Sequence, residues 1–288
     1  MPESARFAVA DAIYDHYKPH SMEEEVPRTI EGAVLSIADK ADSIAGMFAL
    51  GLVPSGSKDP FALRRQANGI VKTIAEHKLP FRLSEIMADA RSHYHGSAAE
   101  KKFANADYAG SVRSFFRERL EFYLKDARGF AYDVVSAVLA IDSDDVVDAA
   151  ARAEAVTKAR GSADFESISI AFKRIKNILR QAGENKRHIA ESLDAAGLAE
   201  DAEKELAALI PATAAAVEKL NATRNYEQAL LEIARLRPAV DKFFDKVMVM
   251  VDDENLRANR VALLQTLVKE FSTIADFSEI VTEGKESK

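Results

Sequence analysis

Apolar residues recur at intervals of three and four along nearly the whole chain, which is the period of one face of an α-helix. The pattern predicts helices over residues 5–17, 27–50, 60–77, 81–94 and 107–128, and shorter ones near 129–140 and 143–160. Two later stripes are formed by Phe165, Ile168, Phe172, Ile175 and Leu179, and by Val240, Phe243, Phe244, Val247 and Val251. A last long helix carries Leu256, Leu263, Leu267, Phe271 and Ile274. We therefore expect an all-α fold.

Breaks in this pattern suggest how the chain is divided. Asp107, Asp164 and the acidic run 252–254 precede apolar stripes and can cap the helices that follow. Residues 95–106 are polar, small and aperiodic, so they form the best candidate boundary. We expect two helical domains, one over residues 1 to about 100 and one over residues 107–288.

Composition narrows the class of protein. Hydrophobic residues make up 48% and charged residues 30% of 288 residues, the balance of a soluble globular protein. No stretch approaches the roughly 18 apolar residues that a membrane helix needs. The chain has no cysteine, which excludes disulfides and thiol catalysis and suits a reducing compartment. We expect a cytoplasmic protein that does not bind membranes.

The net charge of −7 argues against general affinity for DNA, but the charge is unevenly distributed. Residues 60–128 hold 13 basic and 8 acidic side chains within an otherwise acidic chain. A local basic region permits a polyanion site. Ordinary solvated helix faces would give the same count.

The loop from Gly51 to Lys58 resembles a phosphate-binding loop only superficially. That motif needs GxxxxGK followed by Ser or Thr between a strand and a helix, whereas here the order is Gly-Ser-Lys and a helix precedes it. A weaker role remains open, because Lys58, Arg64 and Arg65 flank a helix start whose N–H groups suit a phosphate. The alternative is a structural loop whose arginines pair with acids.

A second candidate site lies near the C-terminus. Arg257 and Arg260 fall in the first turns of the last helix, where the helix dipole disfavours cations, a local cost often tolerated for function. Asn259 could read a base edge, and Lys242 and Lys246 on the preceding helix could bind phosphates. The alternative is that the arginines pair with the acids at 252–254. Lys173, Lys176 and Arg180 share another helix flank.

Three long stretches are similar to the β subunit of bacterial glycyl-tRNA synthetases. They are Ala12–Pro19 followed by Gly32–Gly46, then Gly51–Arg65, then Leu236–Met250 followed by Leu256–Leu264. The likeness spans residues 5 to about 280 and corresponds to the C-terminal part of that subunit. The resemblance implies an HD-like helical domain followed by an anticodon-binding helical bundle, related to that of arginyl-tRNA synthetases.

Asp39 raises the question of a metal site. Ile37–Asp42 resembles the closing metal-ligand segment of HD hydrolases, in which an aspartate corresponds to Asp39. A working site also needs an upstream histidine and an adjacent His-Asp pair, and the chain contains no His-Asp dipeptide. His16 and His20 lie upstream but lack that context. We expect no bound metal and no catalytic residue in this chain.

The resemblance implies the tRNA(Gly)-binding portion of a glycine–tRNA ligase β subunit. A separate α subunit would activate glycine with ATP, so we expect no cofactor here. The partners would be tRNA(Gly) and the α subunit. The candidate tRNA-binding residues are Lys58, Arg64, Arg65, Lys242, Lys246, Arg257, Asn259 and Arg260. Two alternatives stay open: an HD-type metal-dependent phosphohydrolase, and a helical protein-interaction module.

Overall fold

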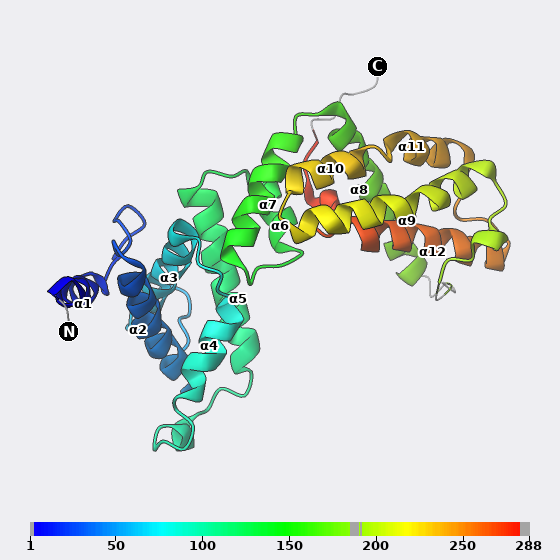
Figure 1. The fold of residues 1–288 in the computed structure, drawn as a ribbon. Coiled ribbons are helices and arrows are strands. Elements are labelled where there is room, and N and C mark those ends of the chain that lie inside the picture. Colours follow the sequence, from blue (N-terminus) through cyan, green and yellow to red (C-terminus); the bar gives the residue numbers. More distant parts are fainter. Residues whose placement is uncertain (1–2, 185–189, 191, 283–288) are drawn as a thin grey trace. The chain divides into compact units, whose positions relative to one another are not determined.

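The computed structural model describes residues 3–184, 190 and 192–282, with side chains from Ala8 onward. Within these residues the chain is helical and contains no β-strand, which confirms the all-α expectation (Figure 1). The extended pairings there are two isolated bridges, Ser55 with Lys58 and Arg82 with Asp145. No helix in this part of the chain is both long and apolar enough to cross a membrane.

The chain forms two compact units, residues 1–130 with 142–150, and residues 131–141 with 151–288. The helices of the first unit are α1 (Glu3–Asp15), α2 (Ile30–Ala49), α3 (Leu63–His77), α4 (Leu83–Ser92) and α5 (Tyr108–Phe122), with a π-helical turn at Tyr123–Ala127 and a short 3₁₀ turn at Glu100–Lys102. Helix α2 packs on α1, α3 and α4, and α5 lies against α2, α3 and α4. Helix α5, which the sequence pattern assigned to the second domain, thus belongs to the first unit.

Capping side chains set where these helices begin. Thr29 accepts a hydrogen bond from the backbone of Gly32, so α2 starts at Ile30 rather than Pro27. Asp107 caps α5 by accepting from the backbone of Gly110, as expected. Asp253 likewise caps the last long helix by accepting from the backbone of Leu256.

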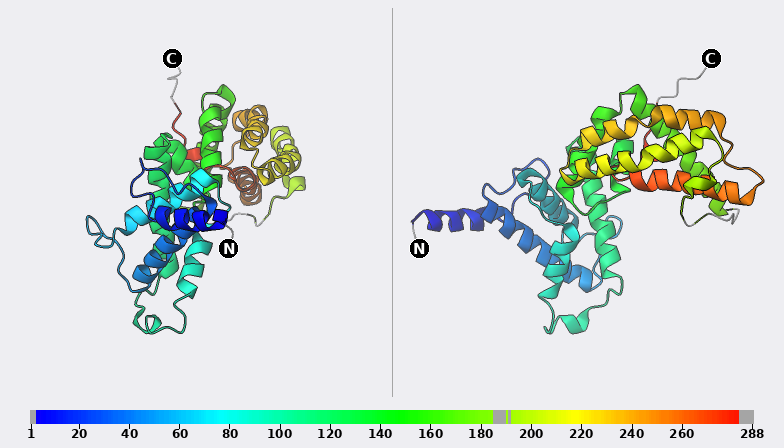
Figure 2. Two further views of the ribbon diagram at one scale, coloured as in Figure 1. Left: turned by 60° about the vertical axis from the view of Figure 1, so that its left-hand side comes forward. Right: turned by 45° about the vertical axis from the view of Figure 1, so that its right-hand side comes forward.

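The second unit is also helical. It comprises α6 (Tyr132–Leu139), the later part of α7 (Val146–Ala159), α8 (Ala163–Glu184), α9 (Asp201–Ala222), α10 (Tyr226–Ala234), α11 (Arg237–Lys246), α12 (Glu254–Phe271) and the 3₁₀ turns Ala195–Gly197 and Phe277–Glu279. Helices α9, α11 and α12 lie side by side in the left view of Figure 2. All residues from Arg257 to Leu264 are buried, so α12 lies within the bundle.

The segment after α12 closes this bundle by returning to α6 and α8. The Phe277 ring lies edge-on to Phe165 and Phe172 of α8, with centroids 5.5 and 5.3 Å away. The buried Arg152 donates to the carbonyl oxygens of Val138 and Ile274, at 2.8 and 3.1 Å. The charged guanidinium is tolerated in the interior because hydrogen bonds to backbone carbonyls replace those it would make to water.

The expectation that Asp164 caps α8 is wrong. The helix begins one residue earlier, at Ala163, and the hydroxyl of Ser162 accepts from the backbone of Phe165 at 3.2 Å. Asp164 therefore lies inside the first turn, where its carboxylate is 2.7 Å from Arg237 of α11. The predicted stripe on α8 is otherwise correct, with four of its members buried and Leu179 partly buried.

Candidate RNA-binding surfaces

Three of the C-terminal candidate residues face the interior of the bundle. Arg257, Asn259 and Arg260 are 7, 6 and 4% exposed. Arg257 donates to the carbonyl oxygens of Val251 and Asp252, at 2.7 and 3.2 Å, rather than to the carboxylates at 252–254. In this structure none of the three can reach a nucleotide, and their hydrogen bonds hold the bundle together.

Asn259 links α12 to the segment before α9. Its amide oxygen accepts from the backbone N–H of Asp194 at 2.8 Å, and its amide nitrogen donates to the backbone carbonyl of Asp194 at 2.7 Å. The amide thus uses both its donor and its acceptor on the backbone of one residue, Asp194. The amide could in principle hydrogen-bond the edge of a base, but here it is used in hydrogen bonds to the backbone of the protein.

Arg260 forms a buried ion pair with Glu203 of α9. Its Nε donates to Oε1 of Glu203 at 2.7 Å, its Nη2 donates to the same oxygen, and its Nη1 donates to the carbonyl of Met248 at 2.8 Å. The side chains of Arg260 and Glu203 are 5 and 0% exposed. A cation near the start of α12 is therefore compensated by a carboxylate of another helix.

The two lysines of α11 differ from each other. Lys242 is half exposed and pairs with Glu205 of α9, and this contact raises the pKa of the lysine. Lys246 is exposed, and within the described residues its ammonium group has no ion pair or hydrogen bond. Only Lys246 therefore offers an uncompensated charge to a phosphate.

Helix α8 carries a further set of cations. Lys176 pairs with Asp276, and Arg180 pairs with Glu184 at 2.8 Å. Burial favours the neutral form of Asp276, but hydrogen bonds from Lys176 and Ser278 outweigh it, so the pKa of this carboxyl is lowered. Lys173 is exposed and unpaired in the described part of the chain. The flank noted from the sequence thus contributes one unpaired cation, Lys173.

Sequence reasoning missed Arg174, which lies between these lysines. Its guanidinium is 4.2 Å from the centroid of the Phe244 ring on α11, a cation–π distance. The arginine is exposed to solvent and lies against this ring. The sequence offered one indication of this contact, the aromatic Phe244 on the apolar stripe. Within α11, Phe244 is the least buried member of that stripe.

In the first unit, the start of α3 is already capped. Asp59 accepts hydrogen bonds from the backbone N–H groups of Leu63 and Arg64, at 2.8 and 3.0 Å. Its carboxylate occupies the place that a phosphate would take at this helix start. The expectation of free N–H groups there is therefore wrong for these two residues.

The side chains around that start remain accessible. Lys58 and Arg65 are exposed and Arg64 is partly exposed. Where the chain is described, none of the three forms an ion pair, so the suggested pairing of Arg64 and Arg65 with acids is not found. Lys58 lies in the tight turn closed by the bridge to Ser55.

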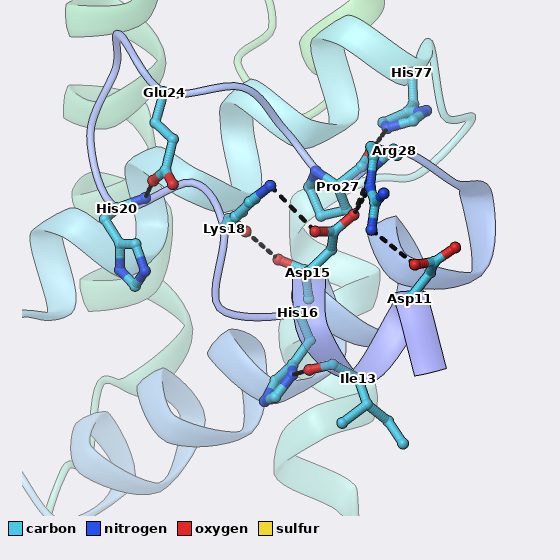
Figure 3. Close-up of polar contacts among 11 residues, drawn as sticks. Asp11, Ile13, Asp15, His16, Lys18, His20, Glu24, Pro27, Arg28 and His77 are labelled. Carbon is cyan, nitrogen blue, oxygen red and sulfur yellow. Dashed lines mark hydrogen bonds and ion pairs between the residues drawn. The ribbon is translucent and has the colours of Figure 1, made fainter. Parts of the chain in front are cut away.

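The histidines upstream of Asp39 are not arranged as metal ligands. His16 donates from Nδ1 to the carbonyl of Ile13, and the backbone N–H of His20 donates to Glu24, as Figure 3 shows. Among the described residues there is no group of three or more His, Asp or Glu side chains that could hold a metal. The next residue, Lys40, is a buried cation, which disfavours a divalent ion nearby.

Two buried lysines fix the connection between α1 and α2. Lys40 donates to the carbonyl oxygens of His16 and Lys18 and to the hydroxyl of Ser36, at 2.9, 3.1 and 2.7 Å. Burial lowers the pKa of this ammonium group to about 8. Lys72 of α3 donates to the carbonyls of Met22 and Glu24.

The same connection is closed at its end by an ion-pair cluster. Asp15, whose side chain is 2% exposed, accepts from Nε of Arg28 at 2.7 Å and lies 3.1 Å from Nζ of Lys18 (Figure 3). The bond from Arg28 is the main cause that lowers the pKa of Asp15 to about 2. His77 of α3 contacts the carbonyl of Pro27 at 2.7 Å. These contacts with side chains of α2 and α3 therefore fix the conformation of residues 16–29.

Comparison with known proteins covers both units. The family model of the glycyl-tRNA synthetase β subunit matches residues 3–140, and that of the DALR anticodon binding domain matches residues 168–280. The glycine–tRNA ligase β subunit of Acidobacterium capsulatum is 52% identical over 280 residues, which cover 95% of this chain and 38% of that protein. Those of Syntrophus aciditrophicus and Desulforamulus reducens are 42 and 39% identical, over 96% of this chain and 39% of each relative.

The chain thus spans about two fifths of the length of these relatives. The two family models together cover most of the described helices, and the relatives agree with them over nearly the whole sequence. On these grounds, the chain belongs to the glycyl-tRNA synthetase β-subunit family.

Proposed function

We propose that this chain is the tRNA(Gly)-binding portion of a glycine–tRNA ligase β subunit and positions tRNA for aminoacylation. The observation that carries the proposal is the match of residues 168–280 to an anticodon-binding domain, in a chain whose relatives bear the ligase name. These residues include α8, α9, α10, α11 and α12 of the second unit. The first unit would correspond to the HD-like domain.

The exposed cations of α8 and α11 are the side chains best suited to the RNA. The two helices pack against each other and carry Lys173, Arg174 and Lys246. Lysines hold phosphates through charge alone, whereas a planar guanidinium held on an aromatic ring can also stack on an unpaired base. We therefore transfer the contact role from Arg257, Asn259 and Arg260, which are buried, to this exposed set. Lys58, Arg64 and Arg65 remain proposed contacts in the first unit.

Catalysis would belong to a separate α subunit, which activates glycine with ATP. This chain supplies helices, exposed cations and an ion-paired interior, and we assign no catalytic residue or cofactor to it. ATP–pyrophosphate exchange with the purified chain tests this division, and glycine-dependent exchange above background would contradict it. The lack of cysteine suits a reducing compartment, and we place the protein in the cytoplasm.

Filter binding of tRNA(Gly) to the chain, with and without the α subunit of the same enzyme, tests the proposed function. We expect retention at low salt that weakens steeply as salt rises, because phosphate contacts release counterions. Absence of retention under both conditions would contradict it. The same result would favour the protein-interaction alternative.

A further inference from the structure

A cavity of about 370 Å³ opens between the connection after α1 and the helices α2 and α3 in the first unit. This volume lies in the range of about 300–1,000 Å³ that is usual for sites of small ligands. The lining includes Tyr17, His20, Asp39, Ser43, Phe61 and Arg65.

Four polar side chains in this lining are not engaged by the protein. In the described residues, the His20 ring, the Asp39 carboxylate, the Ser43 hydroxyl and the Arg65 guanidinium have no hydrogen bond or ion pair. Lys40, by contrast, donates two hydrogen bonds to the connection 16–29 and one to Ser36 of α2, and so helps to fix the wall. The cavity thus combines a rigid wall with a cation, an anion and neutral hydrogen-bonding groups that can receive a ligand.

Two aromatic rings in the same lining are unusually exposed. Tyr17 is 61% and Phe61 43% exposed, although both are large apolar side chains. The centroid of the His16 ring lies 3.9 Å from that of the Tyr17 ring, with the two planes tilted by 38°, so one ring already packs against Tyr17. Exposed aromatic faces beside a positive charge are the means by which proteins hold unpaired bases, since every base has a face that can stack.

We propose that this cavity holds one unpaired nucleotide of an RNA strand, a role that rests on the proposed tRNA-binding function. The base stacks on Tyr17 or Phe61, and Arg65 binds the adjoining phosphate. Asp39 accepts a hydrogen bond from the base edge. A carboxylate selects an exocyclic amino group, as in cytosine, and is repelled by the two carbonyl oxygens that flank the single N–H of uracil. Between the two pyrimidines, the cavity therefore prefers cytosine to uracil.

The test measures binding of fluorescently labelled six-nucleotide RNAs, all cytidine or all uridine, to the full chain, beside tRNA(Gly). We expect the cytidine strand to bind more tightly than the uridine strand. Replacing both rings in one variant, Tyr17→Leu with Phe61→Leu, keeps apolar bulk but removes stacking. It should weaken binding of the cytidine strand by about fivefold or more, since one stacked base contributes about 1–3 kcal/mol. Phe122→Leu, at a 38% exposed ring on α5, should bind like the parent.

Two further variants separate the roles of the charged groups. Asp39→Asn should reduce the preference for cytidine over uridine, because the amide also donates. Arg65→Ala should lower the slope of log affinity against log salt by about 0.7, the value of one phosphate contact in a single strand. Helical circular dichroism and melting temperature of each variant must match the parent, and Tyr17→Leu alone serves if the double variant fails to fold.

The outcomes distinguish this inference from the proposed function. Unchanged binding of the cytidine strand by folded ring variants overturns the cavity proposal, as does binding of tRNA(Gly) without binding of either six-nucleotide strand; both leave the proposed function intact. Displacement of the strand by an equal concentration of cytidine monophosphate assigns the cavity to a free nucleotide and overturns the proposal for a strand. Binding of neither tRNA(Gly) nor the short strands contradicts both.

Discussion

Arg260 of α12 and Glu203 of α9 form an ion pair in the interior of the second unit, 57 residues apart in the sequence. The Nε–Oε1 distance is 2.7 Å, and neither side chain is more than 5% exposed. The second carboxylate oxygen of Glu203 is buried without a hydrogen bond among the described residues. The pair therefore depends on both members, because either one alone would be a charge left in a dry site.

Replacement of Arg260 by Ala should destabilise the chain rather than change its RNA specificity. Removing one member of a buried pair costs about 3–5 kcal/mol, which urea unfolding followed by circular dichroism can measure. The matched control is Lys242→Ala, because its pair with Glu205 is half exposed and should be worth less than about 1 kcal/mol. An Arg260→Ala variant as stable as the parent, with reduced discrimination between tRNAs, would show that the arginine reads RNA after all.

Asn259 should behave as a tether of the segment before α9. Its replacement by Ala leaves the backbone N–H of Asp194 without its partner and removes one of the two hydrogen bonds to the carbonyl of Asp194, the other coming from Gly197, at a cost of about 1–3 kcal/mol. Amide hydrogen exchange should accelerate at Asp194 and in the turn Ala195–Gly197. Asn255→Ala on the exposed face of the same helix is the control and should leave exchange there unchanged. Equal exchange rates at residues 194–197 in the two variants would show that Asn259 does not hold this segment.

Asp15 should make stability depend on pH in the acid range. Its pKa is lowered from 3.8 to about 2 in the folded chain, chiefly by Arg28, so the unfolded chain binds the proton more readily. The stabilisation is fully present above about pH 4 and is lost as the pH falls through about 2. Its size is on the order of 2 kcal/mol, since the pKa shift is nearly two units and one pKa unit corresponds to about 1.4 kcal/mol.

Urea unfolding at a series of pH values tests this expectation for Asp15→Asn. The variant should be less stable than the parent at neutral pH, and the difference should shrink between about pH 4 and pH 2. Asp89→Asn, at an exposed position on α4, is the control. A difference between Asp15→Asn and the parent that stays constant over this range would assign the effect to packing instead of charge.

The lysines of α8 and α11 should contribute unequally to tRNA binding. Lys173→Ala and Lys246→Ala should each lower the salt slope of tRNA(Gly) binding by about one, and should weaken non-cognate tRNA equally. Lys242→Ala should change the slope less, because Glu205 already neutralises that charge. Filter binding over a salt series gives the three slopes. A larger decrease of the salt slope for Lys242→Ala than for Lys246→Ala would indicate that the RNA binds on the side of α11 that faces α9.

Features fixed by neighbours in sequence were predictable. Asp107 and Asp253 cap helices because a carboxylate reaches the backbone N–H three residues ahead, and this spacing is visible in the sequence. The same logic failed at Asp164 because Ser162, two residues earlier, also fits the rule and is the residue that accepts the bond. The acidic Asp59 was overlooked as a cap because the sequence placed the helix start at Pro60, whereas α3 begins at Leu63.

Features fixed by distant partners were not predictable. The position of Arg260 at a helix start was correctly identified as unusual, but its compensation comes from Glu203, which spacing within α12 cannot reveal. Burial of Asn259 likewise depends on the segment around Asp194 returning to α12. Lys40 is bonded to carbonyls more than twenty residues earlier, and nothing in the local pattern marks it as buried. Each of these assignments needs the tertiary packing.

The central claim is that this chain binds tRNA(Gly) and recognises its anticodon. The most direct measurement compares the affinity of the purified chain for a tRNA(Gly) transcript with that for the same transcript carrying a different anticodon, at one fixed salt concentration. We expect at least about tenfold tighter binding of the glycine anticodon, which is the discrimination of one or two base contacts worth about 1–3 kcal/mol each. Equal affinity for the two transcripts, or no binding of either at low salt, would contradict the account.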